Sequence, residues 1–410
     1  MGIRGGIMNV LRPIYHKKHL SVIFDTNNVG NKTVAVDLYN ILTIFINKYQ
    51  SQYPYQYPYP YLIDLIDLIH LYKENDITLI FVIDGKPPLE KQIVIDKRKT
   101  YNAKIARSGF SRISVSREHI YNCKILFDTL GICYLHFENM EADSIFKYLE
   151  DTGISHACYS NDTDMLAYGC NVIRDFDPIT HEAIFINYKS LLTTLPKLTI
   201  TLTTNATDVS ATDASAIKIP DATDAPNATD ATDAIDAIEV LTPAQLLDIF
   251  ILCGTDYNNS LKSTNCSIIL SLILQYKTIE GVIANLDKIN STLKPEYHKS
   301  IPRNFEYEKT RKIFTAQIPE HIKNIINIKV ENCKNDKNIL ETKSHPEHKQ
   351  KLTNKLCNLN TFLQHIGFTY SNSNSCNSSN SSNSSNNSNS SNNSNNKIYI
   401  DKIYDILKMY

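Results

Sequence analysis

The chain has 410 residues, of which 42% are hydrophobic, so it can form one large or two ordinary domains with a sizeable core. Its formal net charge of −1 excludes a uniformly basic nucleic-acid-binding surface, so any such surface must be local. The nine Cys include no Cys-x-x-Cys pair, which argues against a zinc ribbon or a disulfide framework and for a reducing compartment. We find no signal peptide and no apolar run long enough to span a membrane.

The first elements alternate between strand and helix patterns. Residues 32–37 form an apolar run of the buried-strand type that ends in an acid, Asp37. Residues 38–49 and 62–74 have the periodicity of helices. Between them, residues 53–61 repeat Tyr and Pro, which favours an extended loop because Pro cannot continue a helix. The tyrosines of this loop are equally compatible with stacking on nucleic-acid bases and with packing on their own domain.

A second apolar run, residues 77–84, also ends in an acid, Asp84, and is followed by a dense basic stretch. Residues 86–124 carry ten Lys or Arg against three Asp or Glu. Basic residues directly after an acidic strand end suit a polyanion that is led toward metal ions. The alternative, an ordinary solvated helix face, fits this imbalance of charge less well. We therefore expect contacts with a polyanion such as a nucleic acid from basic side chains of this stretch, namely Lys86, Lys97, Lys99, Lys104 and Arg107.

Two pairs of acids, each skipping one residue, follow about one helix apart. Glu141 and Asp143 open an amphipathic helical pattern, and Asp162 and Asp164 follow a short apolar run at residues 156–160. In open α/β sheets the carboxyl ends of strands line the ligand crevice, and carboxylates converging there need cations between them. Oxygen ligands of this kind suit Mg²⁺ or Mn²⁺. Either pair alone could be a helix cap or a plain turn, so the metal interpretation depends on further acids at matching places.

The remaining elements of this half complete an α/β pattern. Residues 117–130 predict a helix, residues 131–137 a strand, and residues 172–174 and 183–186 a hairpin. Strands alternating with helices predict a mostly parallel central sheet flanked by helices.

The second half begins with a change of composition. Residues 193–238 repeat Ala-Thr-Asp and offer little to bury, so we expect a disordered or loosely held insertion that is dispensable for catalysis. Order returns with a helix whose N-cap is Thr242, and Asp256 after that helix supplies a seventh acid. Residues 267–275 and 279–286 predict two further short helices.

Six short motifs, in chain order, resemble those of the flap endonucleases, the XPG-type structure-specific 5′ nucleases. Each is weak alone, but the ordered set is specific and covers roughly residues 1–190 and 241–330. Residue usage rich in Ile, Asn, Lys and Tyr also suggests an AT-rich genome such as that of a large DNA virus. The motifs are Met1-Gly2-Ile3, Val34-Ala35-Val36-Asp37, Phe81-Val82-Ile83-Asp84-Gly85-Lys86-Pro87-Pro88, Glu141-Ala142-Asp143, Asp162-Thr163-Asp164 and Leu252-Cys253-Gly254-Thr255-Asp256-Tyr257.

The resemblance implies a PIN/5′ nuclease-like fold with a C-terminal helix-hairpin-helix-like region and two Mg²⁺ ions, for which Mn²⁺ can substitute. All seven family carboxylate positions are filled, with Asp143 where Glu is usual. Lys91 and Arg98 match the family's catalytic basic residues, which contact the scissile phosphate. By this resemblance one metal is held by Asp37, Asp84, Glu141 and Asp143, and the second by Asp162, Asp164 and Asp256.

The implied activity is two-metal hydrolysis of DNA at 5′ flaps, nicks or junctions, or from 5′ ends, in replication, repair or recombination. The protein is then expected in the nucleus or at an intracellular site of viral DNA replication, with no membrane partner. The alternative is a catalytically inactive DNA-binding scaffold of the same fold, which the complete set of acids disfavours.

The sequence departs from the family pattern in three places. The segment between Asp84 and Glu141 is short, so we expect a reduced arch over the active site, and no sliding-clamp peptide is recognisable. Residues 258–267, where the family has a glycine turn that presents backbone N–H groups to phosphate, contain no Gly. We therefore expect a degenerate helix-hairpin-helix with a weakened hold on duplex DNA, in which Lys262 contacts phosphate through its side chain.

The expected organisation has a nuclease domain in two parts, separated by the insertion and followed by a low-complexity end. Its segments are 1–192 (with the basic gateway at 86–124), the insertion at 193–240, the second nuclease part at 241–330, a C-terminal extension at 331–370, a disordered Asn/Ser tract at 371–396 and a tail at 397–410.

Overall fold

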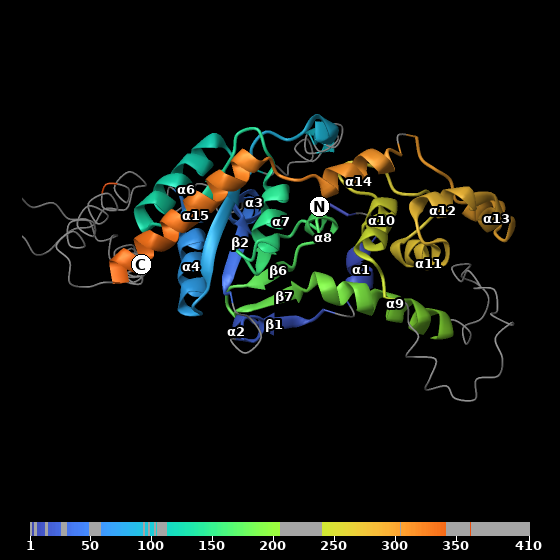
Figure 1. Cartoon of the computed structure of the whole chain (residues 1–410), viewed down its shortest axis with the longest axis horizontal. Helices are drawn as coiled ribbons and strands as arrows, with labels where there is room; N and C mark the ends of the chain where they lie inside the picture. Colours follow the sequence, from blue (N-terminus) through green and yellow to red (C-terminus); the bar gives the residue numbers. More distant parts are fainter. Residues whose placement is uncertain are drawn as a thin grey trace, which may run out of the picture.

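A seven-stranded mixed sheet forms the centre of the molecule (Figure 1). The structure is a computed structural model that describes residues 2–3, 6–12, 15–25, 31–48, 59–92, 95–96, 99–101, 104, 113–205, 240–303, 305–341 and 361. The strand order among these residues is β1-β7-β6-β5-β2-β3-β4. The strands are β1 (Lys17–His19), β2 (Thr33–Asp37), β3 (Thr78–Ile83), β4 (Cys133–His136), β5 (Ala157–Tyr159), β6 (Val172–Asp177) and β7 (Glu182–Ile186).

The inner part of the sheet is parallel and one edge is antiparallel. The parallel pairs are β2 with β3 and β5, β3 with β4, and β5 with β6, whereas β7 runs antiparallel to β6 and β1. The mostly parallel α/β class predicted from the sequence is therefore confirmed. The parallel core also places the carboxyl ends of β2, β3 and β5 at the same edge of the sheet.

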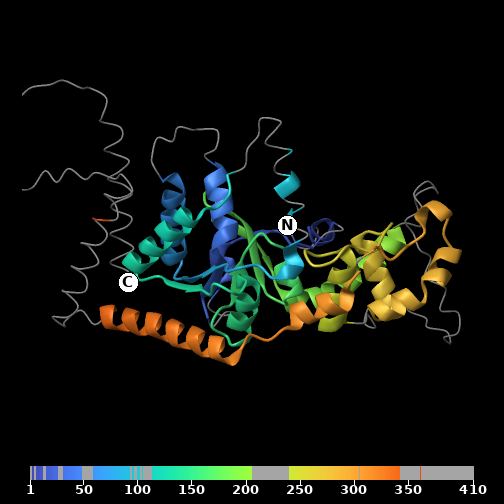
Figure 2. The same cartoon turned by 90° about the horizontal axis from the view of Figure 1, so that it is seen from above.

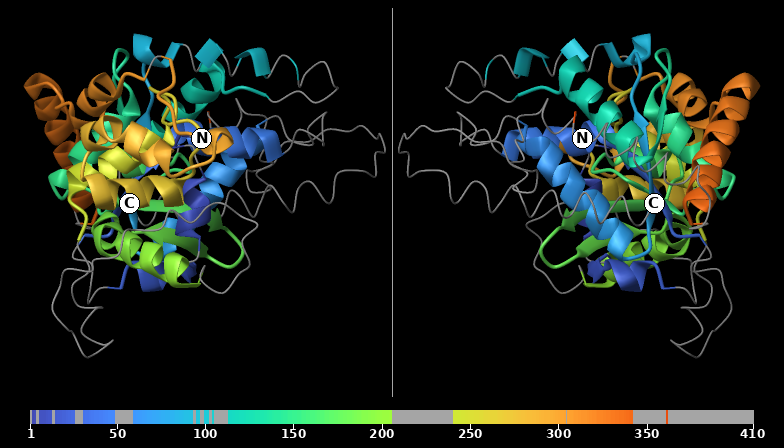
Figure 3. Two further views of the ribbon diagram at one scale, coloured as in Figure 1. Left: turned by 90° about the vertical axis from the view of Figure 1, so that its right-hand side faces the viewer. Right: turned by 90° about the vertical axis from the view of Figure 1, so that its left-hand side faces the viewer.

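Helices cover both faces because successive strand residues point to opposite sides. Val36 and Phe81 pack with α3 (Leu38–Lys48), α4 (Pro60–Glu74) and α6 (Arg117–Leu130). Ala35 and Val82 face the core that includes α7 (Ala142–Asp151) and α15 (Glu320–Glu341). In Figure 2 and in the right-hand view of Figure 3, the long orange helix α15 lies on the opposite side of the sheet from the blue helix α4.

Capping residues explain where the clearest helices begin and end. α6 starts at Ser116, whose hydroxyl accepts from His119 N at 3.3 Å, while His119 Nδ1 accepts from Ser116 N at 2.9 Å. It ends at Gly131, which has a φ of 72°. The predicted N-cap Thr242 is confirmed, since its hydroxyl accepts from Gln245 N at 3.2 Å.

The second half of the chain adds a helical region that shares one core with the α7 face of the sheet. The region comprises α9 (Tyr188–Asn205), α10 (Pro243–Cys253), α11 (Cys266–Tyr276), α12 (Ile279–Ala284), α13 (Leu286–Ser291) and α14 (Tyr307–Thr315). Arg311 holds three of them together by bonding Asp248 at 2.7 Å and Glu280 at 2.9 Å. Figure 1 shows its helices α10, α11, α12 and α13 together at the right-hand end of the molecule. Shorter helices are α1 (Ile7–Leu11), α2 (Leu20–Ile23), α8 (Asp164–Ala167) and the 3₁₀ turns at Leu89–Lys91 and Pro295–Tyr297.

Two helices cross expected segment boundaries. Helix α9 continues to Asn205, so the start of the expected insertion is helical, whereas residues 206–239 lie outside the described residues. Helix α15 spans the expected boundary at residue 330, because Ile326 and Val330 are buried in the shared core. The Asn/Ser tract and the tail also lie outside the described residues, as does the Tyr/Pro loop up to residue 58.

Cys253 and Cys266 form a disulfide, which the spacing of the cysteines did not predict. Their Cα atoms are 5.8 Å apart because the end of α10 meets the start of α11. The absence of a Cys-x-x-Cys pair therefore did not exclude a disulfide between residues brought together by two helices.

No described helix is both long enough and apolar enough to cross a bilayer.

Candidate active site

Three neighbouring parallel strands bring predicted acids to one edge of the sheet. Asp37 is the last residue of β2, Asp84 follows β3, and Asp162 lies three residues beyond the end of β5. Ser160 joins two of these strand ends, because its hydroxyl donates to Asp37 Oδ2 at 2.8 Å and accepts from Asp162 N at 3.0 Å. The three acids thus lie at the carboxyl ends of neighbouring parallel strands, and Ser160 links two of them.

The acids at the start of α7 approach the same edge. Glu141 is the N-cap residue of α7, yet its side chain makes no capping hydrogen bond. Asp84 takes that role instead, since its Oδ1 accepts from Ala142 N at 2.8 Å. The Glu141 side chain therefore does not bond the start of α7 and bonds other side chains instead.

Two glycines allow the backbone to approach this closely. Gly85 N donates to Met140 O at 2.9 Å, and a Cβ on Gly85 would lie only 2.0 Å from Phe137 O. Gly2 has a φ of 96°, and a Cβ there would lie 2.1 Å from Asp162 Oδ1. The N-terminal segment accordingly lies beside α8, where Figure 1 marks the N-terminus. Neither position can accept a side chain without a shift of its neighbours.

The seventh acid arrives from the helical region. Asp256 follows α10, is 4% exposed, and its backbone N donates to Asp164 Oδ2 at 3.4 Å. Asp164 N in turn donates to Asp162 Oδ1 at 3.0 Å. All seven predicted acids therefore lie near one edge of the sheet, where their charges interact, while their role as metal ligands stays a prediction.

The crowding of these acids changes their acidity. Burial raises the pKa of Asp37 to about 7, and burial together with the charges of Asp37 and Asp143 raises the pKa of Asp84 to about 7. Burial also raises the pKa of Glu141 to about 7 and that of Asp164 well above its ordinary value. Positive charge close to the cluster would favour the ionised carboxylates.

One buried oxygen bears directly on whether these residues suit a metal. Asp164 Oδ1 is buried and has no hydrogen-bond partner in the described part of the chain. A buried carboxylate oxygen without a donor is unfavourable unless a cation satisfies it. The all-oxygen set also has the chemistry that Mg²⁺ and Mn²⁺ prefer. Across the described residues, no three His, Cys, Asp or Glu side chains are already gathered at metal-binding spacing. The donors thus fit a hard divalent ion in type, and the metal site itself stays a prediction.

Lys91 lies among the acids rather than on an outer surface. Its Nζ is 2.8 Å from Glu141 Oε1 and 3.0 Å from Asp143 Oδ2. Burial would lower the pKa of Lys91, but the two carboxylates outweigh burial and raise it, so the ammonium stays charged. A lysine here can neutralise the acids, and its predicted contact with phosphate would require it to leave them.

The other predicted basic residues are less informative. Lys86, Lys99 and Lys104 are exposed, and Lys99 Nζ lies 3.8 Å from Asp96. Exposure is compatible with a role in binding DNA and does not establish one. Lys97, Arg98 and Arg107 lie outside the described residues.

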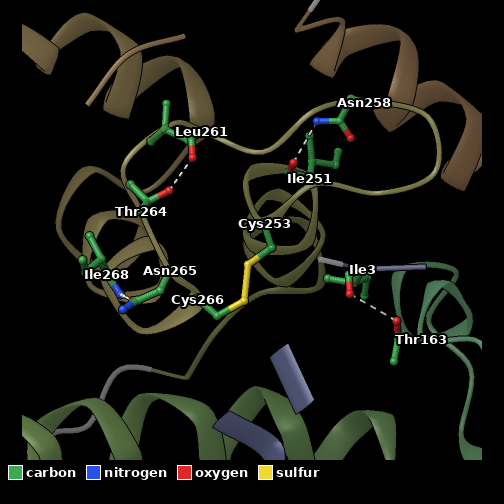
Figure 4. Close-up of a disulfide and its surroundings, with 10 residues drawn as sticks. All are labelled: Ile3, Thr163, Ile251, Cys253, Asn258, Leu261, Thr264, Asn265, Cys266 and Ile268. Atoms are coloured by element: carbon green, nitrogen blue, oxygen red, sulfur yellow. Dashed lines mark hydrogen bonds between the residues drawn. A yellow bond between two sulfur atoms is a disulfide. The ribbon is translucent and has the colours of Figure 1, made fainter. Parts of the chain in front are cut away.

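The loop expected to be a degenerate helix-hairpin-helix turn keeps a defined shape without glycine. Ser263 takes the left-handed conformation, with a φ of 54°. Asn265 caps α11 by accepting from Ile268 N at 2.9 Å (Figure 4). The buried Lys299 side chain donates to Ser263 O, and Lys262 N donates to Ser300 O at 3.1 Å while its side chain is exposed. Other groups of the protein thus bond to backbone carbonyls and amides of this turn. The expected weaker contact of the turn with DNA stays a prediction.

Two tyrosines and one serine at the site were given no role by sequence reasoning. Tyr257 contacts Glu141, Tyr168 contacts Tyr257, and Ser160 bonds Asp37. The position of Tyr257 directly after Asp256 was the available signal. Nothing in the spacing of Tyr168 indicated that it would meet a residue 89 positions away.

Comparison with protein families finds two matching regions. The model of the XPG N-terminal domain matches residues 1–105, and that of the XPG I-region matches residues 135–256. The two ranges contain all seven acids and Lys91.

Several similar proteins have names that describe them as nucleases. The "Probable flap endonuclease 1 homolog" of Danio rerio is 24% identical over 290 residues, covering 71% of this chain and 66% of that protein. The "Flap endonuclease GEN homolog 1" of Homo sapiens is 30% identical over 188 residues, covering 43% of this chain and 19% of that protein. The "Probable RAD2-like endonuclease 369L" of Invertebrate iridescent virus 6 is 26% identical over 204 residues, covering 48% and 36% respectively. This chain thus spans less than two thirds of each relative.

Solved structures share the fold. The catalytic core of Rad2 in complex with DNA substrate has a TM-score of 0.51 at 14% identity, covering 89% of this chain and 95% of that one. Human GEN1 in complex with Holliday junction DNA has a TM-score of 0.51 at 17% identity, covering 91% and 81%. GEN1 in complex with product DNA and Mg²⁺ has a TM-score of 0.51 at 14% identity, covering 89% and 74%. At these identities the likeness establishes the fold alone.

Proposed function

The chain belongs to the XPG family, and we propose that it is a structure-specific DNA nuclease that hydrolyses phosphodiester bonds at 5′ flaps or junctions with two divalent metal ions. The observation that supports the proposal is that all seven predicted acids lie close enough at one edge of the sheet to interact electrostatically, together with the buried Asp164 oxygen that has no donor among the described residues. The relatives named as flap endonucleases, and the neighbours solved with DNA, support a DNA substrate.

We assign the acids to two groups as the resemblance to the family implies. Asp37 and Asp84, at the strand ends, would hold one Mg²⁺ with Glu141 and Asp143. The second ion would be held by Asp162, Asp164 and Asp256. When bound, such a pair of ions supplies an activated water and stabilises the charge that develops on the scissile phosphate.

The side chains of the protein prepare the site for that chemistry. Ser160 fixes Asp37, and the amide of Ala142 fixes Asp84, so these two carboxylates keep their orientation when the site ionises. The carboxylates of Glu141 and Asp143 can exchange the ammonium of Lys91 for a divalent ion. Lys91 would then be free to contact a phosphate oxygen and offset its negative charge.

A cleavage assay tests the proposal. Purified protein with Mg²⁺ should cut a 5′-flap, a nicked duplex or a four-way junction, and EDTA should stop it. Asp162→Asn should lower kcat by roughly 100-fold or more while duplex binding persists. Asp177→Asn, on the exposed β6–β7 hairpin, is the matched control and should leave cleavage unchanged.

The substrate panel also separates the alternatives. Comparing a free with a blocked 5′ end distinguishes flap cutting from 5′ exonuclease action, and the four-way junction reports resolution. A wild type that binds these substrates but cuts none of them with Mg²⁺ or Mn²⁺ is instead the inactive scaffold. A DNA substrate would place the protein in the nucleus or at an intracellular site of viral DNA replication.

A further inference from the structure

Two tyrosine hydroxyls form a chain that ends on Glu141. Tyr257 OH lies 3.0 Å from Glu141 Oε2, and Tyr168 OH lies 3.1 Å from Tyr257 OH. The ring of Phe314 packs edge-on against both tyrosine rings, with centroid distances of 4.8 and 5.3 Å. The two phenols are thus held side by side against one aromatic ring.

The direction of the hydrogen bonds follows from the number of protons. A carboxylate can only accept, so Tyr257 donates its one proton to Glu141. The bond between the two hydroxyls must then be donated by Tyr168 to the oxygen of Tyr257. Tyr168 therefore acts on Glu141 only through Tyr257.

The two oxygens of Glu141 have different partners. Oε2 is bonded to Tyr257, while Oε1 is 2.8 Å from the ammonium of Lys91. The Glu141 side chain does not cap α7, because Asp84 bonds the backbone there. With one oxygen fixed by a neutral donor, the other faces the position of a cation.

The ring of Tyr257 contacts the same cation from another side. Lys91 Nζ lies 5.0 Å from the centroid of this ring. An ammonium over the face of an aromatic ring is attracted to it by electrostatics. The ring offers Lys91 a contact that does not depend on the carboxylates.

The loop that carries Tyr257 is itself well fixed. Tyr257 N donates to Thr255 Oγ1 at 3.1 Å. Figure 4 shows the bond that Asn258 Nδ2 donates to Ile251 O at 2.8 Å. The disulfide between Cys253 and Cys266 closes this loop at its ends. Tyr257 is therefore held on a short, cross-linked segment rather than on a free loop.

We propose that Tyr257 is a positioning residue that holds Glu141 with one oxygen directed to a divalent ion, and that Tyr168 acts by holding Tyr257. The inference rests on the proposed function, because it concerns how that site binds its metal. It assigns to the tyrosine pair a role in metal affinity rather than in the chemical step.

The test measures metal binding without DNA and without turnover. Free Mn²⁺ is measured by electron paramagnetic resonance during titration of the full-length protein and of the Tyr257→Phe, Tyr168→Phe and double variants, which remove hydroxyls and keep the rings. Tyr257→Phe should weaken Mn²⁺ binding by about 10-fold, and Tyr168→Phe by about 3-fold. The double variant should match Tyr257→Phe within about twofold, because Tyr168 acts through Tyr257. Tyr148→Phe, which removes a hydroxyl bonded to Asn327 away from the site, should bind as the wild type does.

Cleavage then distinguishes positioning from a merely structural effect. Tyr257→Phe should require more Mn²⁺ for half-maximal rate and should recover the wild-type kcat at saturating Mn²⁺. Wild-type Mn²⁺ affinity in Tyr257→Phe overturns the inference, and so does a double variant whose losses multiply. A wild type that binds no Mn²⁺ overturns both this inference and the proposed function, whereas binding by the wild type with an unchanged Tyr257→Phe overturns the inference alone.

Discussion

Metal ions should stabilise this protein far more at pH 8 than at pH 5. In the metal-free fold, the pKa values of Asp37, Asp84 and Glu141 are raised to about 7. In the unfolded chain such groups titrate near 4. Between pH 4 and 7 the unfolded chain therefore releases protons that the fold retains, so the free energy of unfolding falls as pH rises. Their contribution to stability is complete below about pH 4 and is lost above about pH 7.

The size of the effect follows from the pKa values. A rise from 3.8 to about 7 for Asp37 corresponds to about 4 kcal/mol for one carboxyl group. Because the three carboxyl groups interact, their contributions do not add. We therefore take the value for one group as the expected change in the free energy of unfolding. For a domain of this size, 1 kcal/mol shifts Tm by about 2–4 °C. Divalent ions that stabilise the ionised carboxylates should thus raise Tm by about 10 °C at pH 8, and by about 2 °C or less at pH 5.

Thermal unfolding followed by circular dichroism, with Mg²⁺ or with EDTA at pH 5, 6, 7 and 8, measures this shift. Asp37→Asn removes one raised carboxyl and should flatten the pH dependence of the EDTA sample while reducing the gain from Mg²⁺. Asp287→Asn, at an exposed position, is the control and should follow the wild type. A Mg²⁺-induced shift of equal size at all four pH values would refute the argument, because the acids would then not be the groups that bind the ion.

Three further substitutions test contacts that hold the site in place, each by thermal unfolding. Gly85→Ala should lower the free energy of unfolding by about 2–3 kcal/mol, since the new Cβ would meet a backbone carbonyl. The control Gly153→Ala has open space around its new Cβ and should lower it by about 1 kcal/mol, because of its φ of 70°. Equal losses in the two variants would contradict the steric argument. Cys266→Ser should lower the free energy of unfolding by about 3 kcal/mol by opening the disulfide loop, and a reductant should do the same to the wild type. If neither change affects stability, the cross-link is disproved. Arg311→Met should lower stability by about 3–5 kcal/mol, because it leaves Asp248 buried without its partner; a loss below 1 kcal/mol would show that the ion pair is dispensable.

The strand-end acids could be predicted because the signal is local and its consequence is geometric. An apolar run that ends in Asp37, and another that ends in Asp84, each predict a buried strand with an acid at its carboxyl end. Parallel pairing of β2 with β3 and β5 then brings those ends together whatever the details of the loops. The same local reasoning located α6 to the residue, because its cap and its terminal glycine are both in the sequence.

Contacts between distant segments could not be predicted in this way. Tyr168 and Tyr257 meet only because α8 and α10 pack together, and no periodicity encodes that pairing. Helix α15 was missed because its polar residues obscure the spacing of Ile322, Ile326 and Val330, which is evident once the shared core is known. The disulfide arises for the same reason, from two helix ends that meet.

The contacts of Lys91 suggest why the site combines a lysine with so many acids. The ammonium bonds Glu141 Oε1 and Asp143 Oδ2, so a divalent ion on those oxygens has to displace it. The free energy of metal binding would then be the difference between the free energy gained by binding the ion and the free energy needed to release the lysine. The ring of Tyr257, which already contacts Lys91, lies where the released ammonium can remain near the site. Metal uptake and the freeing of Lys91 for a phosphate would in this way be one exchange, in which a positive charge is available to the acids both before and after the ion binds.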